Sequence, residues 1–120
     1  MSSIARSGKL IDLEDGITLE VLEERENFLI GRKEIEGIVY HGGKGTPAIP
    51  SLREKISKKL GVDLKQTYIR SLKTEYGAAR SRILLHIYKA PKLASEYEPK
   101  HIIERNKTLQ EEIEEAEKRG

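Results

Sequence analysis

The segment Lys73–Arg82 combines the two kinds of side chain that proteins use to hold nucleic acids. Tyr76 lies within it, and four cations flank that tyrosine on the turn and on the residues just before it: Arg70, Lys73, Arg80 and Arg82. Guanidinium and ammonium groups bind phosphates, while a tyrosine ring can stack on an unpaired base or pack against a ribose. The segment is equally compatible with a plain hairpin loop, in which Tyr76 covers the sheet edge and Gly77 takes a positive φ. Both interpretations remain open from these residues alone.

A second candidate is the glycine-rich stretch GGKGT at Gly42–Thr46. It is not a Walker loop, because Lys44 is followed by Gly45 where that loop requires Ser or Thr. Glycine permits close approach of the main chain to a phosphate backbone, so Lys44 is a candidate contact. A flexible loop is the default interpretation of such a stretch.

Catalytic and metal-binding groups are sparse. The chain has no cysteine, which excludes thiol nucleophiles, disulfides and Cys-ligated metal sites. His101 and Glu104 have the spacing of helical metal ligands, but a site needs three or four ligands and no second cluster appears. No serine has the strand–turn–helix setting of a nucleophile elbow, and no carboxylate pair lies in apolar surroundings. We therefore expect a protein that is not an enzyme and has no metal, cofactor or small-molecule substrate.

Charge is distributed unevenly along the 120 residues, although the formal net charge is only +2. Residues 1–36 carry 5 basic and 9 acidic side chains, residues 37–92 carry 12 and 3, and residues 93–120 carry 5 and 8. A basic block of this size is the electrostatic footprint expected for a polyanion partner. Carboxylates from the flanking segments could equally neutralise it in space, so the pattern alone leaves both possibilities open.

Uninterrupted apolar runs never exceed three residues. A membrane-spanning helix needs about 20 such residues and a signal peptide an apolar region of about 7–15, so we expect no membrane partner and an intracellular, soluble protein. The length corresponds to one domain.

Hydrophobic periodicity predicts four strands and two helices. Alternation indicates strands at Thr18–Glu24, Lys33–His41, Thr67–Leu72 and Arg82–Tyr88. We expect an α+β two-layer sandwich in which a four-stranded antiparallel sheet is covered by helices, in the order strand-strand-helix-strand-strand-helix. Residues 1–16 are unpatterned and are expected to form an N-terminal arm that can be flexible. Residues 17–106 are then a single α+β domain and residues 107–120 a charged helical extension.

The first helix shows the clearest boundaries. Ser51 and Glu54 have the spacing of a capping box, Gly61 supplies a left-handed stop, and Leu52, Ile56 and Leu60 form a buried stripe. The opposite face is predicted to carry four cations: Arg53, Lys55, Lys58 and Lys59. The second helix is expected to begin near Glu98-Pro99, because proline suits the first helical position.

Several runs, in order along the chain, resemble one protein family. They are Val21–Asn27 with Leu29 and Arg32–Glu34, Tyr40-His41, Gly45–Pro47, the basic helix, Arg70 and Leu72–Gly77 through Ile87-Tyr88, Glu98–Lys100, and Glu104–Asn106. The family is the twenty-fourth protein of the small ribosomal subunit, of the type shared by archaea and eukaryotes. The resemblance covers about residues 19–106, and the short form without a tail is similar to archaeal members.

This resemblance implies a non-catalytic constituent of the small ribosomal subunit in the cytoplasm. Its implied partners are ribosomal RNA and neighbouring ribosomal proteins, and its implied role is to support translation. Charge and motif together select these RNA-facing candidates: Arg32, His41, Lys44, Lys55, Lys58, Lys59, Arg70, Lys73, Tyr76, Gly77, Arg80 and Arg82. The alternative is a protein-interaction module that docks through its acidic C-terminal helix, with Ile102, Leu109 and Ile113 as anchors.

Overall fold

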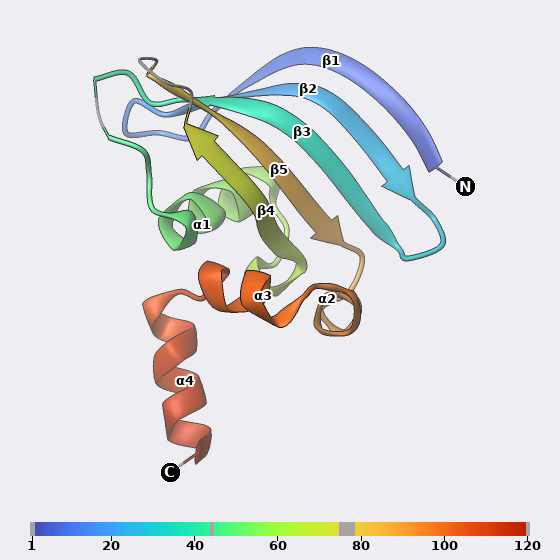
Figure 1. The fold of residues 1–120 in the computed structure, drawn as a ribbon, viewed down its shortest axis with the longest axis vertical. Helices are drawn as coiled ribbons and strands as arrows, with labels where there is room; N and C mark the ends of the chain where they lie inside the picture. The colour runs from blue at the N-terminus through green and yellow to red at the C-terminus, as the bar shows by residue number, and fades with distance from the viewer. Residues whose placement is uncertain (1, 44, 75–78, 120) are drawn as a thin grey trace.

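The computed structural model describes residues 2–43, 45–74 and 79–119, which form an antiparallel sheet and four α-helices (Figure 1). The strands are β1 (Ser2–Asp12), β2 (Thr18–Asn27), β3 (Arg32–Tyr40), β4 (Thr67–Thr74) and β5 (Arg80–Tyr88). The helices are α1 (Ile49–Leu60), α2 (Pro91–Tyr97), α3 (Lys100–Asn106) and α4 (Leu109–Arg119), with a short 3-10 turn at Leu64–Gln66 before β4.

The sheet has five strands in the order β1-β2-β3-β5-β4, and every neighbouring pair is antiparallel. The α+β class is confirmed, but the predicted four-stranded sheet and its element order are wrong. The additional strand, β1, comes from the segment that was expected to be an arm. It escaped detection because an edge strand buries little: Leu10 is 64% exposed, and Ile11 packs only partly against the core. The division of the chain at residues 16 and 106 stays a prediction.

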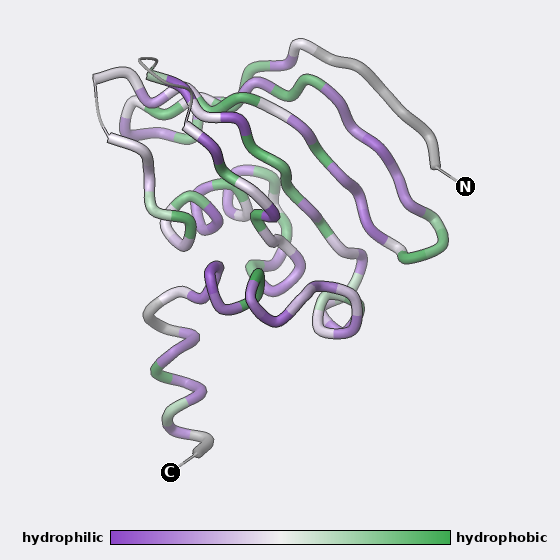
Figure 2. The backbone as a smooth tube through the Cα atoms, in the orientation of Figure 1, coloured by the Kyte–Doolittle hydropathy of each residue, from purple (hydrophilic) through white to green (hydrophobic). Residues whose placement is uncertain are grey.

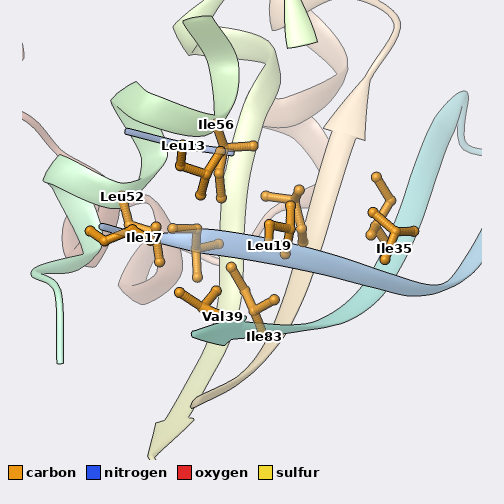
Figure 3. Packing of buried hydrophobic residues seen from close by; sticks show 11 residues of the cluster. Leu13, Ile17, Leu19, Ile35, Val39, Leu52, Ile56 and Ile83 are labelled. Carbon is orange, nitrogen blue, oxygen red and sulfur yellow. The ribbon is translucent and has the colours of Figure 1, made fainter. Parts of the chain in front are cut away.

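The main core lies between α1 and one face of the sheet (Figure 3). Leu52 and Ile56 of α1 are fully buried against strand residues that include Leu19, Val39 and Ile83. The predicted stripe of α1 is therefore confirmed for these two residues, and its third member, Leu60, packs against the same core while only partly buried.

The start of α1 differs from the prediction, whereas its end agrees. Gly61 has φ 70° and ends the helix in the left-handed conformation, as expected. The helix begins at Ile49 with Ala48 as the N-cap, and no side chain caps it, so the capping box at Ser51 is wrong. Proline in the first turn explains the earlier start, since its fixed φ is already helical and its missing N–H is not needed there.

The predicted C-terminal helix, expected to begin near Glu98-Pro99, is divided into α3 and α4, and α2 precedes its expected start. Pro99 separates α2 from α3, because the residue before proline is driven out of the helical region. Thr108 and Glu111 then form a reciprocal cap that starts α4: the Glu111 N–H donates to Thr108 Oγ1 (3.2 Å), and the Thr108 N–H donates to Glu111 Oε1 (3.1 Å). Figure 2 shows that α4, which projects away from the sheet, is mainly hydrophilic. No helix within the described ranges is long and apolar enough to cross a membrane.

Candidate nucleic-acid interface

Three cations gather where β4 and β5 approach their connecting turn. Lys73 on β4 is the Cα partner of Arg82 on β5, and partners across an antiparallel pair point to the same face of the sheet. Arg80 lies two residues before Arg82 and therefore shares that face. All three are exposed, whereas the intervening Ser81 is fully buried on the face that α1 covers. We call Lys73, Arg80 and Arg82 the hairpin cations; they lie on the face opposite α1.

Two of the hairpin cations contact groups on β3. Arg82 Nη1 donates to Glu36 Oε1 at 3.0 Å, with side chains 55% and 33% exposed, so this ion pair is screened by solvent. Arg80 is the Cα partner of Tyr40, whose hydroxyl donates to Glu20 Oε1 at 2.7 Å. That hydrogen bond raises the pKa of Tyr40, and Arg80 acts in the opposite direction.

Tyr40 was missing from the sequence-based candidates. Its ring lies on the same face as the hairpin cations, because Ile38 and Tyr40 are the β3 partners of Arg82 and Arg80. The strand alternation had already placed Ile38 and Tyr40 on one face. The signal that could have identified Tyr40 was the β3–β5 pairing, which no local pattern contains.

A chain of hydrogen bonds fixes the glycine-rich loop against the β4–β5 end. The His41 N–H donates to Ala79 O at 3.0 Å, and His41 Nε2 lies 3.1 Å from Ser81 Oγ. Ser81 Oγ is 3.0 Å from Thr74 Oγ1, which is 2.5 Å from Thr46 Oγ1. Because His41 is only 3% exposed, its side chain supports the loop and does not face outward.

Three predicted contacts, Lys44, Tyr76 and Gly77, lie outside the described residues. The hydrogen bonds of His41 to Ala79 and of Thr46 to Thr74 place both ends of the glycine-rich loop at the same end of the sheet as the hairpin cations. Arg70 lies on β4 at the register shift between Ile69 and Ser71 and is partly buried. Arg70 is therefore only partly exposed, whereas the hairpin cations lie on the surface.

Arg32 lies at the far end of the sheet. Tyr40 is eight residues further along β3, which is about 26 Å along an extended strand. Arg32 Nε donates to Glu34 Oε2 at 2.7 Å, and Nη1 donates to the Tyr88 hydroxyl at 2.9 Å. The structure therefore does not bring Arg32 to the hairpin cations but engages it in a network within the fold.

That network continues to Glu98, a buried carboxylate before α3. Tyr88 Oη donates to Glu98 Oε2 at 2.5 Å, and His86 Nδ1 lies 3.0 Å from the same oxygen. Burial opposes ionisation, but the hydrogen bonds from His86 and Tyr88 outweigh it and hold the pKa of Glu98 below its ordinary value of 4.5. Burial and the hydrogen bond to Glu98 raise the pKa of Tyr88. These groups join the β3–β5 end of the sheet to the α2–α3 connection.

The family model for ribosomal protein S24e matches residues 17–107. The chain belongs to the ribosomal protein S24e family. Relatives named small ribosomal subunit protein eS24 include one from Pyrobaculum arsenaticum, 42% identical over an alignment of 94 residues that covers 74% of this chain and 78% of the relative. One from Pyrobaculum aerophilum is 38% identical over 89 residues, which are 74% of both chains. One from Saccharolobus solfataricus is 36% identical over 98 residues, which are 82% and 79%.

The S24e match confirms the family resemblance. It includes the hairpin cations, Tyr40 and the glycine-rich loop, and it includes α1. β1 and α4 lie outside it. The residues of the candidate interface therefore belong to the S24e domain itself.

The α1 cations of this S24e chain divide into two groups. Lys58 and Lys59 are exposed, and Lys55 Nζ donates to Asp15 Oδ2 at 2.7 Å; these three lie on the helix layer, away from the hairpin cations. Arg53 was predicted to share their face, and this is wrong, because it is 0% exposed.

Arg53 instead joins four other parts of the chain to α1: the 3-10 turn, β4, α3 and α4. Its guanidinium donates to three backbone carbonyls, Thr67 O at 2.6 Å, Leu64 O at 2.7 Å and Asn106 O at 2.8 Å, and to the Glu111 carboxylate. The same group lies 4.5 Å from the centre of the Tyr68 ring. A guanidinium can be buried here because its five N–H groups find acceptors in a planar fork, which an ammonium group could not match.

Proposed function

We propose that the chain is a structural constituent of the small ribosomal subunit and binds ribosomal RNA through the hairpin cations. Membership of the S24e family supports the assignment to the ribosome, since the relatives are named small ribosomal subunit proteins. On this proposal the protein works in the cytoplasm, within the ribosome and beside other ribosomal proteins. It contributes binding and shape, not catalysis.

The observation that carries the RNA interface is the register of β4 and β5. It sets Lys73, Arg80 and Arg82 on one exposed face at one end of the sheet. The paired strands already fix the backbone positions of these cations, so binding to a polyanion has to order only their side chains. Tyr40 beside Arg80 adds a ring that can pack against a ribose or base.

The adjoining loops extend this surface. The hydrogen bonds from His41 to Thr46 hold the glycine-rich loop beside the β4–β5 end, so Lys44 is proposed as a further phosphate contact. Tyr76 and Gly77 lie between Lys73 and Arg80 in the sequence and are proposed as further RNA contacts. Lys58 and Lys59 are proposed as a separate, weaker contact on α1.

The salt dependence of binding to purified small-subunit RNA tests the proposal. If about six phosphates are contacted, affinity falls by roughly a thousandfold between 50 and 200 mM salt. The double variant Arg80→Ala/Arg82→Ala removes two contacts, so the slope of log affinity against log salt becomes shallower by about 1.8 and the loss shrinks to roughly 80-fold.

A charge-matched control separates specific contact from net charge. Lys92 and Lys100 are exposed on α2 and α3, so Lys92→Ala/Lys100→Ala removes the same charge and is expected to leave the slope nearly unchanged. Equal slopes for the two double variants would contradict the proposed surface. A large loss of thermal stability in Arg80→Ala/Arg82→Ala would show that these arginines serve the fold instead.

The Arg82–Glu36 pair offers a second, opposite perturbation. A phosphate that binds Arg82 must compete with the Glu36 carboxylate, so Glu36→Gln is expected to tighten RNA binding by a few-fold at low salt, within the range of exposed ion pairs. The gain should vanish when Arg82 is also replaced by alanine.

Cosedimentation with small subunits in high-magnesium sucrose gradients tests the assignment to the small ribosomal subunit.

A further inference from the structure

The chain just before α4 is held tightly against the domain. Asn106, the last residue of α3, is fully buried. Its amide covers the β4 edge of the sheet: the Ile69 N–H donates to Asn106 Oδ1 at 2.7 Å, and Asn106 Nδ2 donates to Ile69 O at 2.9 Å. Arg53 of α1 donates to the Asn106 carbonyl at 2.8 Å. These bonds fix the point from which α4 leaves the domain.

Two ion pairs determine which side of α4 faces the domain. Arg53 donates to Glu111, and Lys107 donates to Glu115. Glu111 and Glu115 are four residues apart and therefore share one side of the helix. Each residue advances about 100° around the helix axis, so Ile113, two residues from both glutamates, lies about 160° from either of them. A polar side of α4 thus faces the domain, and Ile113 is directed away from it.

This orientation of α4 is the reverse of the usual one, in which an amphipathic helix turns its apolar side toward the core. Ile113 is 44% exposed, and Ala116 is exposed as well. Leu109 and Ala116 are four and three residues from Ile113, which is the spacing of one apolar stripe. We call Leu109, Ile113 and Ala116 the α4 stripe. Ile102 was predicted as an anchor together with Leu109 and Ile113, and this is wrong, because Ile102 is buried in the domain.

α4 lacks the packing that normally stabilises a helix. It is 11 residues long, and isolated helices shorter than about 12–15 residues are marginal in water. None of its side chains in the described range 111–117 is buried, and Figure 1 shows the helix projecting away from the sheet and the other helices. Helices in proteins gain most of their stability when an apolar side packs against a neighbour. A partner on the α4 stripe would supply that packing.

The charges at the borders of the α4 stripe indicate the chemistry of such a partner. Glu112 borders the stripe on one side and Glu117 on the other, and both are exposed. In the part of the chain that the structure describes, neither takes part in an ion pair, whereas Glu111 and Glu115 do. The two borders therefore present carboxylates that a cationic side chain can approach.

A hollow next to Glu112 adds to this complementarity. It has a volume of about 230 Å³, lies between α3 and α4, and is lined by Glu104, Lys107, Glu112, Glu115 and Ala116. Because Lys107 already bridges Glu104 and Glu115, Glu112 is the acid of the hollow that is left for a partner. A long cationic side chain that enters the hollow beside Ala116 can reach it.

We propose that the α4 stripe docks a helix of a neighbouring protein that carries an apolar stripe bordered by lysine or arginine. Its apolar side chains pack on Ile113 and Ala116, and its cations pair with Glu112 and Glu117. Pairs of helices commonly combine an apolar seam with charged flanking positions that select the partner and its orientation. The family match ends at residue 107, so this attachment lies beyond the S24e domain.

Two other occupants are disfavoured by the same charges. α4 carries five acidic and two basic side chains, so the phosphates of RNA would meet a net negative charge. A second copy of the chain would set the acidic borders of two α4 helices against each other, and such like-charge contacts are unfavourable. The proposal goes beyond RNA binding and does not depend on it, because α4 projects away from the sheet that carries the hairpin cations.

A labelled helical peptide with a leucine stripe bordered by lysines tests the proposal when it is titrated into the full chain. We expect saturable binding, with slower hydrogen exchange of the α4 amides in the complex. A second peptide has the same leucine stripe but glutamate borders. It should bind roughly tenfold more weakly or less, since its charges would face those of Glu112 and Glu117.

One pair of variants tests the charged borders. Glu112→Gln/Glu117→Gln should weaken binding of the lysine-bordered peptide by roughly three- to tenfold. Glu14→Gln/Glu96→Gln is the matched control, because it removes the same charge from exposed positions on the β1–β2 turn and α2. This control should leave the affinity unchanged.

A second pair of variants tests the apolar stripe. Ile113→Gln should weaken peptide binding by roughly five- to twentyfold, because the peptide covers the exposed part of the isoleucine. Glutamine is at least as good a helix former as isoleucine, so a weaker helix does not explain such a loss. Leu29→Gln is the control, since Leu29 is an exposed apolar side chain on the β2–β3 turn, and it should have no effect.

Several outcomes would overturn the proposal. Absence of saturable binding, equal binding of the two peptides, unchanged exchange of the α4 amides at saturation, or equal affinity of a variant and its control would each exclude docking of a cationic helix. Self-association through α4 in sedimentation, or protection of α4 by RNA, would assign the stripe to a different occupant. None of these variants touches the hairpin cations, so RNA affinity measured in parallel shows separately whether the proposed function holds.

Discussion

Replacement of Arg53 by methionine is expected to destabilise the fold strongly. The guanidinium is fully buried, and its hydrogen bonds reach the 3-10 turn, β4, α3 and α4. Methionine is of similar length but supplies no donor. The variant therefore leaves three backbone carbonyls and the Glu111 carboxylate without the partner they have in the wild type.

The magnitude follows from those groups. A buried polar group left without its partner costs about 1–3 kcal/mol, and breaking a buried charge pair costs about 3–5 kcal/mol. Water can reach the Glu111 side, which is 16% exposed, so we expect a loss near the middle of the range, about 4 kcal/mol. For 120 residues the entropy of unfolding corresponds to about 4 °C per kcal/mol, so Tm should fall by about 15 °C.

Urea unfolding followed by far-UV circular dichroism measures this loss, since the chain has no tryptophan. Lys58→Met is the control on the same helix: the side chain is exposed, and a change within about 0.5 kcal/mol is expected. Arg53→Lys keeps the charge but loses the planar fork, so it should fall between the wild type and Arg53→Met.

A loss below about 1 kcal/mol for Arg53→Met would refute this reasoning. It would mean that the desolvation of the buried guanidinium offsets its hydrogen bonds, as happens for some buried ion pairs. Equal stability of Arg53→Lys and the wild type would also contradict it, because charge alone would then explain the contribution.

Three further perturbations test the fold. A Cβ on Gly37 would lie 2.4 Å from a β2 carbonyl oxygen, so Gly37→Ala should cost about 1–3 kcal/mol in urea unfolding, whereas Gly43→Ala meets nothing within 4 Å and should be tolerated far better. Asn106→Leu uncovers the β4 edge at Ile69 and should cost about 2–4 kcal/mol, with faster hydrogen exchange of the Ile69 amide; unchanged exchange would argue against the amide cover. The pKa of Glu98 is lowered on folding, so its contribution to the free energy of unfolding is present above pH 4.5 and is lost as the pH falls through the folded value. Glu98→Gln should therefore show a shallower loss of stability with acid, and parallel curves would exclude that role.

The parts of the fold that sequence reasoning predicted are those with a strong local signal. β2, β3, β4 and β5 all overlap strands predicted from alternation, and α1 shows the expected buried pair Leu52 and Ile56 and its stop at Gly61. Such signals arise because burial on one face imposes a period of 2 or 3.6 on the sequence. β1 lacks that period: within its described side chains, residues 8–12, Ile11 packs against the core and Leu10 is exposed.

The candidate interface was predictable in composition but not in geometry. The cluster of cations around residues 70–82 is visible in the sequence, whereas the register that sets Lys73 beside Arg82, and Tyr40 beside Arg80, depends on how β4, β5 and β3 pair. The sequence around His41 does not indicate that its side chain is buried, because its partners Ser81 and Ala79 are about 40 residues away in the chain.

The sequence by itself determined the α+β class, the S24e family and the division of charge along the chain. These properties depend on the composition, the order and the short-range periodicity of the residues, all of which are present in the sequence without the folded structure. The tertiary structure decided which charges are available to a partner. Arg53 and Arg82 are both arginines in the basic block, yet one is closed in by four distant segments and the other faces solvent. Burial of a charge depends on acceptors supplied by remote parts of the chain, and only the folded arrangement brings those acceptors together.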